Sequence, residues 1–288
     1  MAHQSKTKQF LVVAALVTLV ALTLLPFYMT IMMSQKTNGE IINHFWALPE
    51  QLHLDYYSDA WKYIKIYIYN SLIVGAVAVL GVTWLSSLAG YVFARLDFSG
   101  KRVVFLLIIA LMMIPGIMTL IPSFLWYKEF PFVGGNDWLG RGGHGFLNTR
   151  WVLFLPYIAG GQIFGIFLCR TFFSNISESL FEAARIDGAS ELQIYFKIAL
   201  PLVLPIIATL AILTFVGAYN DYIWPLITVS DKSVQTFSVG VTKFTADGNL
   251  QRGQAMAGFV MGSIPLIIVF AFGMKYYIQG ITQGAVKG

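Results

Sequence analysis

The stretch "SLFEAARIDGASELQIYFKIALPLVLP", residues 179–205, interrupts a chain that is otherwise strongly apolar. Long uncharged runs lie on both sides of it, yet the stretch itself contains five charged residues: Glu182, Arg185, Asp187, Glu191 and Lys197. Two questions follow for the fold: what the uncharged runs form, and why a hydrophobic protein places a polar segment between them.

The uncharged runs are long enough to cross a membrane. Of the 288 residues, 57% are hydrophobic and 11% are charged, whereas a soluble domain carries about 25% charged residues. Because a spanning helix needs about 20 residues, we predict an all-α polytopic membrane protein with six transmembrane helices. The six windows that lack Asp, Glu, Lys and Arg are residues 9–35, 66–94, 103–127, 151–169, 198–220 and 253–274.

The first window has two possible interpretations, because Lys6 and Lys8 precede it as the basic residues of a signal peptide would. Its apolar core is longer than the roughly 7–15 residues of a cleaved signal, and no clear small-residue cleavage site follows. We therefore expect a retained first span.

The distribution of positive charge favours cytoplasmic termini. With both termini inside, ten Lys and Arg residues lie inside and nine outside, so this count barely favours one orientation over the other. The short loop "RLDFSGKR" (95–102) holds three cations, however, and the tail before the first span is purely basic. The sequence pI of about 9.2 then reflects membrane topology, and nucleic acid is not an expected partner. The single cysteine, Cys169, excludes an intrachain disulfide and is expected to be a small packing residue.

Three loops complete this topology. Residues 36–65 form an external loop, and the glycine-rich connection "VGGNDWLGRGGHG" (133–145) is either a docking surface or an insertion. Residues 220–252 have an apolar part too short to cross as a helix, so we expect a re-entrant or interfacial segment.

The polar stretch itself predicts two short helices joined by a turn. Ser179 and Glu182 fit a capping box, as do Ser190 and Gln193. Gly188 lies between them, and glycine suits the left-handed conformation that ends a helix. From spacing alone the segment is either an amphipathic linker on the membrane surface or a docking device for another protein.

The stretch also resembles a known motif. "EAARIDGASELQIYFKIALPLVLP" is similar to the EAA loop of ATP-binding-cassette importer permeases, which reads EAA, three residues, G, nine residues, then I-x-L-P. Further likeness to the carbohydrate-uptake branch, the maltose-type second permease, appears in "NDYIWPLI" (220–227), "MAG" (256–258) and "QGITQGAVKG" (279–288). From about Asn70 to its end the chain resembles that branch.

The resemblance implies an inner-membrane permease subunit with an N-terminal part (1–68) and a permease core (69–288). Its coupling loop, residues 178–200, would dock on a separate ATPase dimer, and its C-terminal tail would add contacts. The resemblance also implies a second permease subunit, an external solute-binding protein, surrounding membrane lipid and a sugar or oligosaccharide substrate. The coupling residues carried over are Glu182, Ala183, Ala184, Asp187 and Gly188.

No catalytic motif accompanies these features. The sequence lacks G-x-x-x-x-G-K-[ST], so we expect no cofactor in this chain, with ATP and Mg²⁺ bound by the partner ATPase. An ion-coupled secondary transporter is the main alternative, but carriers of that kind place ionisable residues within spans and the six windows have none. A membrane scaffold protein is the third possibility.

The candidate substrate contacts are polar and aromatic residues in or next to the spans, where they would hydrogen-bond or stack on a sugar. Aromatic residues at span ends are also common interface anchors, so each of these assignments has a structural alternative. The candidates are Asn70, Tyr219, Asn220, Tyr222 and Trp224.

Overall fold

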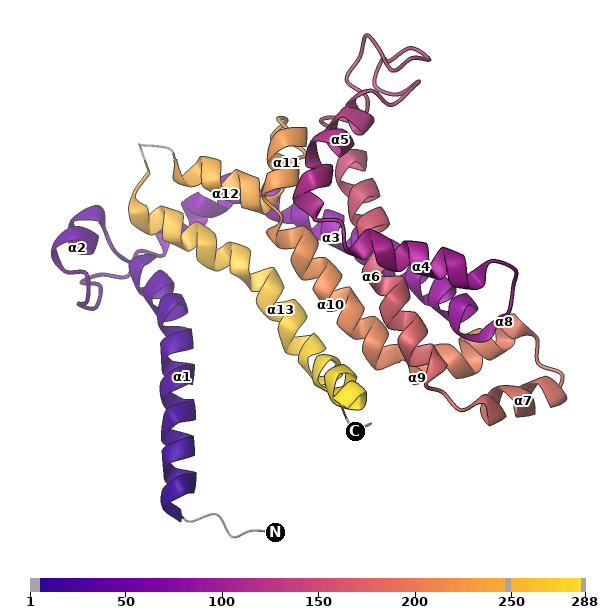
Figure 1. The fold of residues 1–288 in the computed structure, drawn as a ribbon. Coiled ribbons are helices and arrows are strands. Elements are labelled where there is room, and N and C mark those ends of the chain that lie inside the picture. The colour runs from indigo at the N-terminus through magenta and orange to yellow at the C-terminus, as the bar shows by residue number, and fades with distance from the viewer. Residues whose placement is uncertain (1–5, 247–249, 286–288) are drawn as a thin grey trace. The chain divides into compact units, whose positions relative to one another are not determined.

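In a computed structural model, which describes residues 6–246 and 250–285, every regular element is a helix (Figure 1). The described residues contain no β-strand, so the predicted all-α class is confirmed. In chain order the helices are α1 (Lys6–Met33), α2 (Asn38–Asn43), α3 (Asp55–Arg95), α4 (Lys101–Met112), α5 (Gly116–Lys128), α6 (Trp151–Ser174), α7 (Glu178–Ile186), α8 (Glu191–Ile194), a π-helical turn (Tyr195–Ala199), α9 (Leu200–Leu202), α10 (Leu204–Asn220), α11 (Ile223–Thr228), α12 (Phe237–Thr245) and α13 (Arg252–Ala285).

The helices form two compact units. The first contains the chain up to Lys65 together with Val241–Ile264, and the second contains Ile66–Gly240 together with the chain from Pro265 onward. Helices α3, α12 and α13 therefore contribute to both units. The boundary predicted from the sequence lies after residue 68 and assigns residues 241–264 to the permease core, whereas these residues belong to the first unit. The expected C-terminal tail continues α13 as far as Ala285, and its last three residues lie outside the described ones.

All six predicted windows coincide with helical segments. Four belong to continuous helices that are long and apolar enough to cross a membrane: Thr7–Met33, Asp55–Arg95, Trp151–Ser174 and Arg252–Tyr276. The other two are bent pairs, with an angle of 101° between α4 and α5 and of 74° between the segments Glu191–Leu202 and Leu204–Asn220. The prediction of six spans holds if each bent pair is one broken span.

The bend between α4 and α5 has a clear origin in the sequence. Pro115 is the N-cap of α5 with extended backbone angles (φ −61°, ψ 128°). Proline lacks the N–H that would continue a helix and disfavours helical angles in the residue before it. Proline alone does not decide the matter, because α1 and α6 run on through Pro26 and Pro156.

In the first unit a buried lysine fixes the loop after α1. The side chain of Lys36 is fully buried, and its Nζ donates to the carbonyls of His44 at 2.8 Å and of Phe45 at 2.9 Å. These carbonyls lie at the C-terminal end of α2, where a cation is favourable. At the other end of α2, Thr37 and Glu40 form a capping box. Backbone groups at both ends of this short helix therefore have side-chain hydrogen-bond partners.

In the second unit the helices approach closely where glycines face them. A Cβ added to Gly90 of α3 would lie 2.5 Å from Cβ of Cys169 on α6, and one added to Gly165 of α6 would lie 2.2 Å from Oγ of Ser86. Small residues let membrane helices pack backbone to backbone. Cys169 is fully buried with a free thiol, which confirms its predicted packing role.

The glycine-rich loop between α5 and α6 has a specific fold. The buried side chain of Asn136 donates to the carbonyls of Lys128 at 2.8 Å and of Phe130 at 3.0 Å, and it accepts from the N–H of Gly143 at 2.9 Å. Gly134 has a positive φ of 59° and packs directly on backbone, so no other residue fits there. Within the second unit this loop lies at the end opposite to α7 and α8 (Figure 1).

We predict that Gly90→Ala destabilises the second unit by about 1–3 kcal/mol, because the added methyl overpacks the α3–α6 crossing. The matched control is Gly160→Ala on α6, where an added Cβ would have no neighbour within 4 Å and alanine favours the helix. Thermal unfolding of the detergent-purified protein measures the stability of both variants. Equal melting temperatures for the two variants would contradict the close crossing.

Candidate functional site

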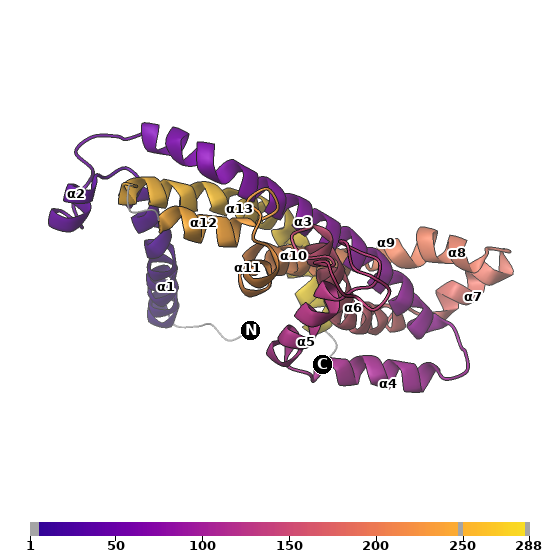
Figure 2. The same cartoon turned by 90° about the horizontal axis from the view of Figure 1, so that it is seen from above.

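The polar segment folds as two short helices at one end of the second unit, where α3 leads into α4 (Figures 1 and 2). The second predicted capping box is confirmed at the start of α8, with Ser190 and Gln193 bonded reciprocally. The predicted turn is also confirmed: Asp187 ends α7 and Gly188 has a φ of 81°, which favours glycine.

The first predicted capping box is wrong. Helix α7 begins at Glu178, with Ser177 as an N-cap that makes no side-chain capping bond. The hydroxyl of Ser179 instead lies 2.8 Å from that of Ser177. The helix starts earlier than expected because Glu178 lies in its first turn and meets a cation from α3.

That cation is Arg95, the last residue of α3. Its side chain is only 6% exposed, and its Nη1 donates to Oε2 of Glu178 at 2.6 Å. Its Nη2 donates to the carbonyls of Phe173, at 2.5 Å, and of Ile176. The guanidinium also lies over the ring of Phe181, 4.1 Å from its centroid. One buried group thus joins the ends of α3 and α6 to the beginning of α7.

A second arginine extends this connection to α8. Arg185 donates from Nη1 to Oε1 of Glu178 at 3.1 Å and from Nε to Oε1 of Glu191 at 2.9 Å. The hydroxyl of Tyr91 on α3 donates to the other oxygen of Glu191 at 2.9 Å. Burial by itself raises the pKa of Glu191, but these hydrogen bonds outweigh it and lower the pKa. Helices α3, α7 and α8 are therefore joined by one network of charges.

The two faces of α7 differ. Phe181 is fully buried and Ala184 is 8% exposed, and both belong to the core beneath the helix. Glu182, Ala183 and Asp187 are exposed. Ala184 thus differs from the expectation that both alanines face a partner. Sequence reasoning also missed Ile186, which is 85% exposed; the signal was a large apolar residue among polar ones.

Three of the candidate substrate residues are engaged within the protein. Asn70 is fully buried; its Nδ2 donates to the carbonyls of Ser233 and Gln235, and its Oδ1 accepts from Arg150 at 3.1 Å. Tyr219 is 1% exposed and stacks on Phe215, with ring centroids 5.7 Å apart. The indole N–H of Trp224 donates to the carbonyl of Val152 at 2.8 Å. Asn220 and Tyr222 are exposed.

Trp224 nevertheless borders a cavity of about 390 Å³. Thr119, Ser123, Tyr157 and Asp221 contribute polar groups to its wall. A neighbouring cavity of about 330 Å³ shares Tyr157 and Asp221, and the Tyr157 hydroxyl donates to Oδ2 of Asp221 at 2.9 Å. The cavities lie beside two helix termini. Gly116 is the first residue of α5, and Asp221 is the C-cap of α10.

Neither member of this pair was predicted from the sequence. Asp221 follows directly after the fifth uncharged window. The window therefore ends one residue before a carboxylate that lines both cavities. The available signal was an acidic residue between an apolar run and a segment too short to span.

Apolar helices long enough to cross a membrane, a polar cavity, and a polar helix pair joined to α3 by ion pairs are the features expected of a membrane transport component. The family described as "Binding-protein-dependent transport system inner membrane component" matches residues 61–283, and the chain belongs to this family. It is therefore a multi-pass membrane protein of a transport system and not an enzyme.

Curated relatives agree with this assignment. The chain is 30% identical to the melibiose/raffinose/stachyose import permease protein MelC of Bacillus subtilis, over 99% of both chains. It is 32% identical to the trehalose/maltose transport system permease protein MalG of Thermococcus litoralis, over 80% of this chain and 78% of that one. A bacterial ABC transporter involved in import of alginate shares the fold, with a TM-score of 0.77, 23% identity and coverage of 96% of this chain and 100% of that one.

We predict that Arg95→Met loosens α7 while the rest of the protein stays folded. Loss of charge-assisted hydrogen bonds costs about 1.5–3 kcal/mol, so trypsin cleavage after Arg185 should accelerate by roughly tenfold or more, because cleavage follows the open population. The purified protein in detergent is digested and the fragments are identified by mass. Arg141→Ala, an exposed arginine at the opposite end of the unit, should leave the rate unchanged, and an equal rate in both variants would contradict the anchoring role.

Proposed function

We propose that the chain is one of two permease subunits of a sugar or oligosaccharide importer driven by a separate ATPase dimer. The observation that carries the proposal is the construction of α7. It presents Glu182, Ala183 and Ile186 on its exposed side, while Arg95 and Arg185 fix it to the spans behind. A partner that moves α7 would move α3 and α6 with it.

The residue types suit docking on another protein. Ala183 leaves room for close approach, Ile186 offers an exposed apolar contact, and nothing among the described residues binds the Glu182 carboxylate, which can meet a basic partner group. The chain has no phosphate-binding loop, so ATP and Mg²⁺ belong to the partner ATPase. This coupling end then faces the cytoplasm, with both termini on the same side of the bacterial inner membrane.

The substrate class rests on two supports. The named relatives MelC and MalG are permeases for sugars. The cavity around Tyr157 and Asp221 offers hydroxyl and carboxylate groups beside the indole of Trp224, the combination that hydrogen-bonds and stacks on a sugar. A solute-binding protein would deliver the substrate at the opposite end of the unit from α7, beside the glycine-rich loop.

One observation favours the alternative function, an ion-coupled secondary transporter. Asp221 lines the cavity wall, and ionisable residues within spans mark ion pathways in carriers. Transport in proteoliposomes separates the two proposals, since only the importer requires the ATPase and ATP inside the vesicle.

We predict that Ala183→Trp removes the ATPase subunit during gentle purification and lowers sugar uptake at least tenfold. The indole would occupy the space that the partner needs, whereas α7 keeps its own packing because Ala183 is exposed. Co-elution is measured by mass spectrometry, and membrane insertion by the amount of protein in the membrane fraction. Ala110→Trp, on an exposed position of α4 within a span, should retain the ATPase. Normal co-elution and uptake in Ala183→Trp would overturn the coupling proposal.

We predict that Tyr157→Phe raises the apparent KM for sugar uptake with ATPase co-elution unchanged, because it removes one hydroxyl from the cavity wall and frees Asp221. Loss of one hydrogen bond of about 1 kcal/mol corresponds to roughly a fivefold change. Uptake of labelled sugar against concentration is the measurement. Thr18→Val, which changes an exposed hydroxyl of α1 bonded to its own helix, is the control. An unchanged KM in Tyr157→Phe would place the substrate elsewhere.

A further inference from the structure

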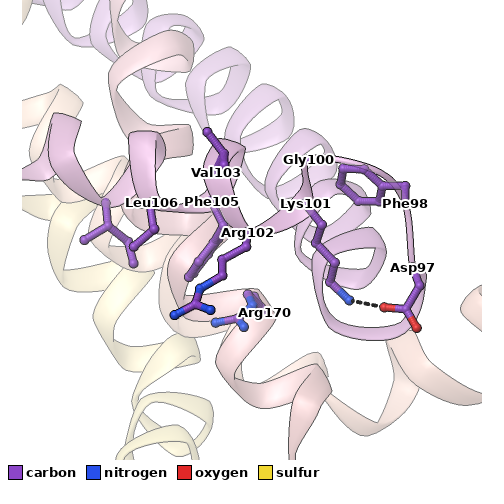
Figure 3. A pocket seen from close by; sticks show the side chains of 10 residues that line it. Asp97, Phe98, Gly100, Lys101, Arg102, Val103, Phe105, Leu106 and Arg170 are labelled. Carbon is purple, nitrogen blue, oxygen red and sulfur yellow. Dashed lines mark hydrogen bonds and ion pairs between the residues drawn. The ribbon is translucent and has the colours of Figure 1, made fainter.

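A basic cavity of about 770 Å³ lies at the start of α4, against the end of α6 (Figure 3). We call it the α4–α6 pocket and define it by the residues that carry the argument: Lys101, Arg102, Leu106 and Ile109 of α4, and Arg170 of α6. The cavity contains none of the predicted site residues and none of the residues of the charge network around α7.

The charges of the pocket are unbalanced. Asp97 is the one carboxylate among its lining residues, and it is paired with Lys101 at 3.1 Å. Within the described part of the chain, no carboxylate forms an ion pair with Arg102 or Arg170. Figure 3 shows both guanidinium groups extending into the same region beside α4. Two like charges directed into one cavity, without a counter-ion, favour an anion between them.

Arg170 has a fixed position at the wall of the pocket. Its guanidinium lies 3.9 Å from the centre of the Phe105 ring, which holds the group in place. Its Nε is buried and has no hydrogen-bond acceptor among the described residues. A buried charged donor without an acceptor is unfavourable. Because Nε is inaccessible, an anion in the pocket would pair with the Nη nitrogens of this guanidinium.

The chemistry of the donors points to phosphate. Guanidinium groups match phosphate oxygens in paired geometry, and two of them converge here. The pocket also includes the N-terminus of α4, whose N-cap Gly100 has no side chain to satisfy the first N–H groups. Free N–H groups and the helix dipole at such an end favour an anion.

The wall of the pocket selects a lipid over a free anion. Leu106 and Ile109 line the cavity below the basic groups, and the neighbouring Val103 and Leu106 are 62% and 55% exposed. These exposed apolar side chains can pack against the acyl chains of a lipid. A free phosphate ion would leave this surface unused, whereas a phospholipid places its phosphate at the arginines and its chain along α4.

We propose that the α4–α6 pocket binds the phosphate headgroup of an anionic phospholipid. The position of the pocket at the cytoplasmic side rests on the proposed function, but binding itself does not. Arg170 precedes by three residues Phe173, whose carbonyl holds Arg95, so the lipid would stand beside the anchor of the coupling helix.

Native mass spectrometry of the detergent-purified protein tests the proposal. The protein is titrated with phosphatidylglycerol and, separately, with phosphatidylcholine. We expect a preference for phosphatidylglycerol that falls about tenfold in Arg102→Gln/Arg170→Gln, the size expected for loss of a charge-assisted hydrogen bond. Arg102→Lys/Arg170→Lys should keep most of the preference, and Arg141→Gln, outside the pocket, should keep all of it.

Arg102→Gln alone keeps the test valid if the double variant does not fold, because Arg102 is exposed and its loss should still lower the preference. Equal binding of both lipids by the natural protein, or an unchanged preference in the glutamine variants, would overturn the proposal. A second titration adds millimolar inorganic phosphate as competitor. Complete displacement of the lipid by phosphate would show a free-anion site and overturn the lipid assignment. Lipid binding is measured without uptake or ATPase, so its failure is separate from failure of the proposed function.

Discussion

The polar end of this protein depends on the hydrogen bonds and the ion pair made by the buried guanidinium of Arg95. A buried cation costs free energy unless its donors are paired. The acceptors for the two Nη groups of Arg95 come from the end of α6 and the first turn of α7, while its Nε has no acceptor among the described residues. The same group that must be satisfied at the end of α3 therefore determines where α7 begins and which face it turns inward. A helix of only nine residues gains from this a fixed position that its own length would not provide.

The membrane imposes a corresponding constraint at the opposite side of the core. Backbone that leaves the helical conformation at membrane depth must be buried in protein or must line a polar cavity. The break at Pro115 and the end of α10 at Asp221 obey this rule together, because residues from both border the cavity that contains Tyr157. The bend after Pro115 thus lies at the polar cavity, so irregular backbone and polar side chains occur together in this unit.

Features that depend on neighbours in sequence were predictable, and features that depend on distant residues were not. The spans follow from runs without charge, and the second capping box and the turn at Gly188 follow from local hydrogen bonding. The predicted start of α7 was wrong because the helix start depends on Arg95, which lies 83 residues before Glu178. The burial of Ala184 and the internal hydrogen bonds of Asn70 could not be predicted for a similar reason, since their partners are brought to them by tertiary packing.

The burial of Cys169 has a practical consequence for the study of motion in this protein. The only thiol in the sequence is enclosed by the crossing of α3 and α6 and is fully inaccessible, and burial in apolar surroundings makes a cysteine inert. The natural chain is therefore a silent background for maleimide chemistry. A cysteine introduced on an exposed side chain of α7 would carry a spectroscopic label alone, and distances from it would follow the coupling helix through a transport cycle.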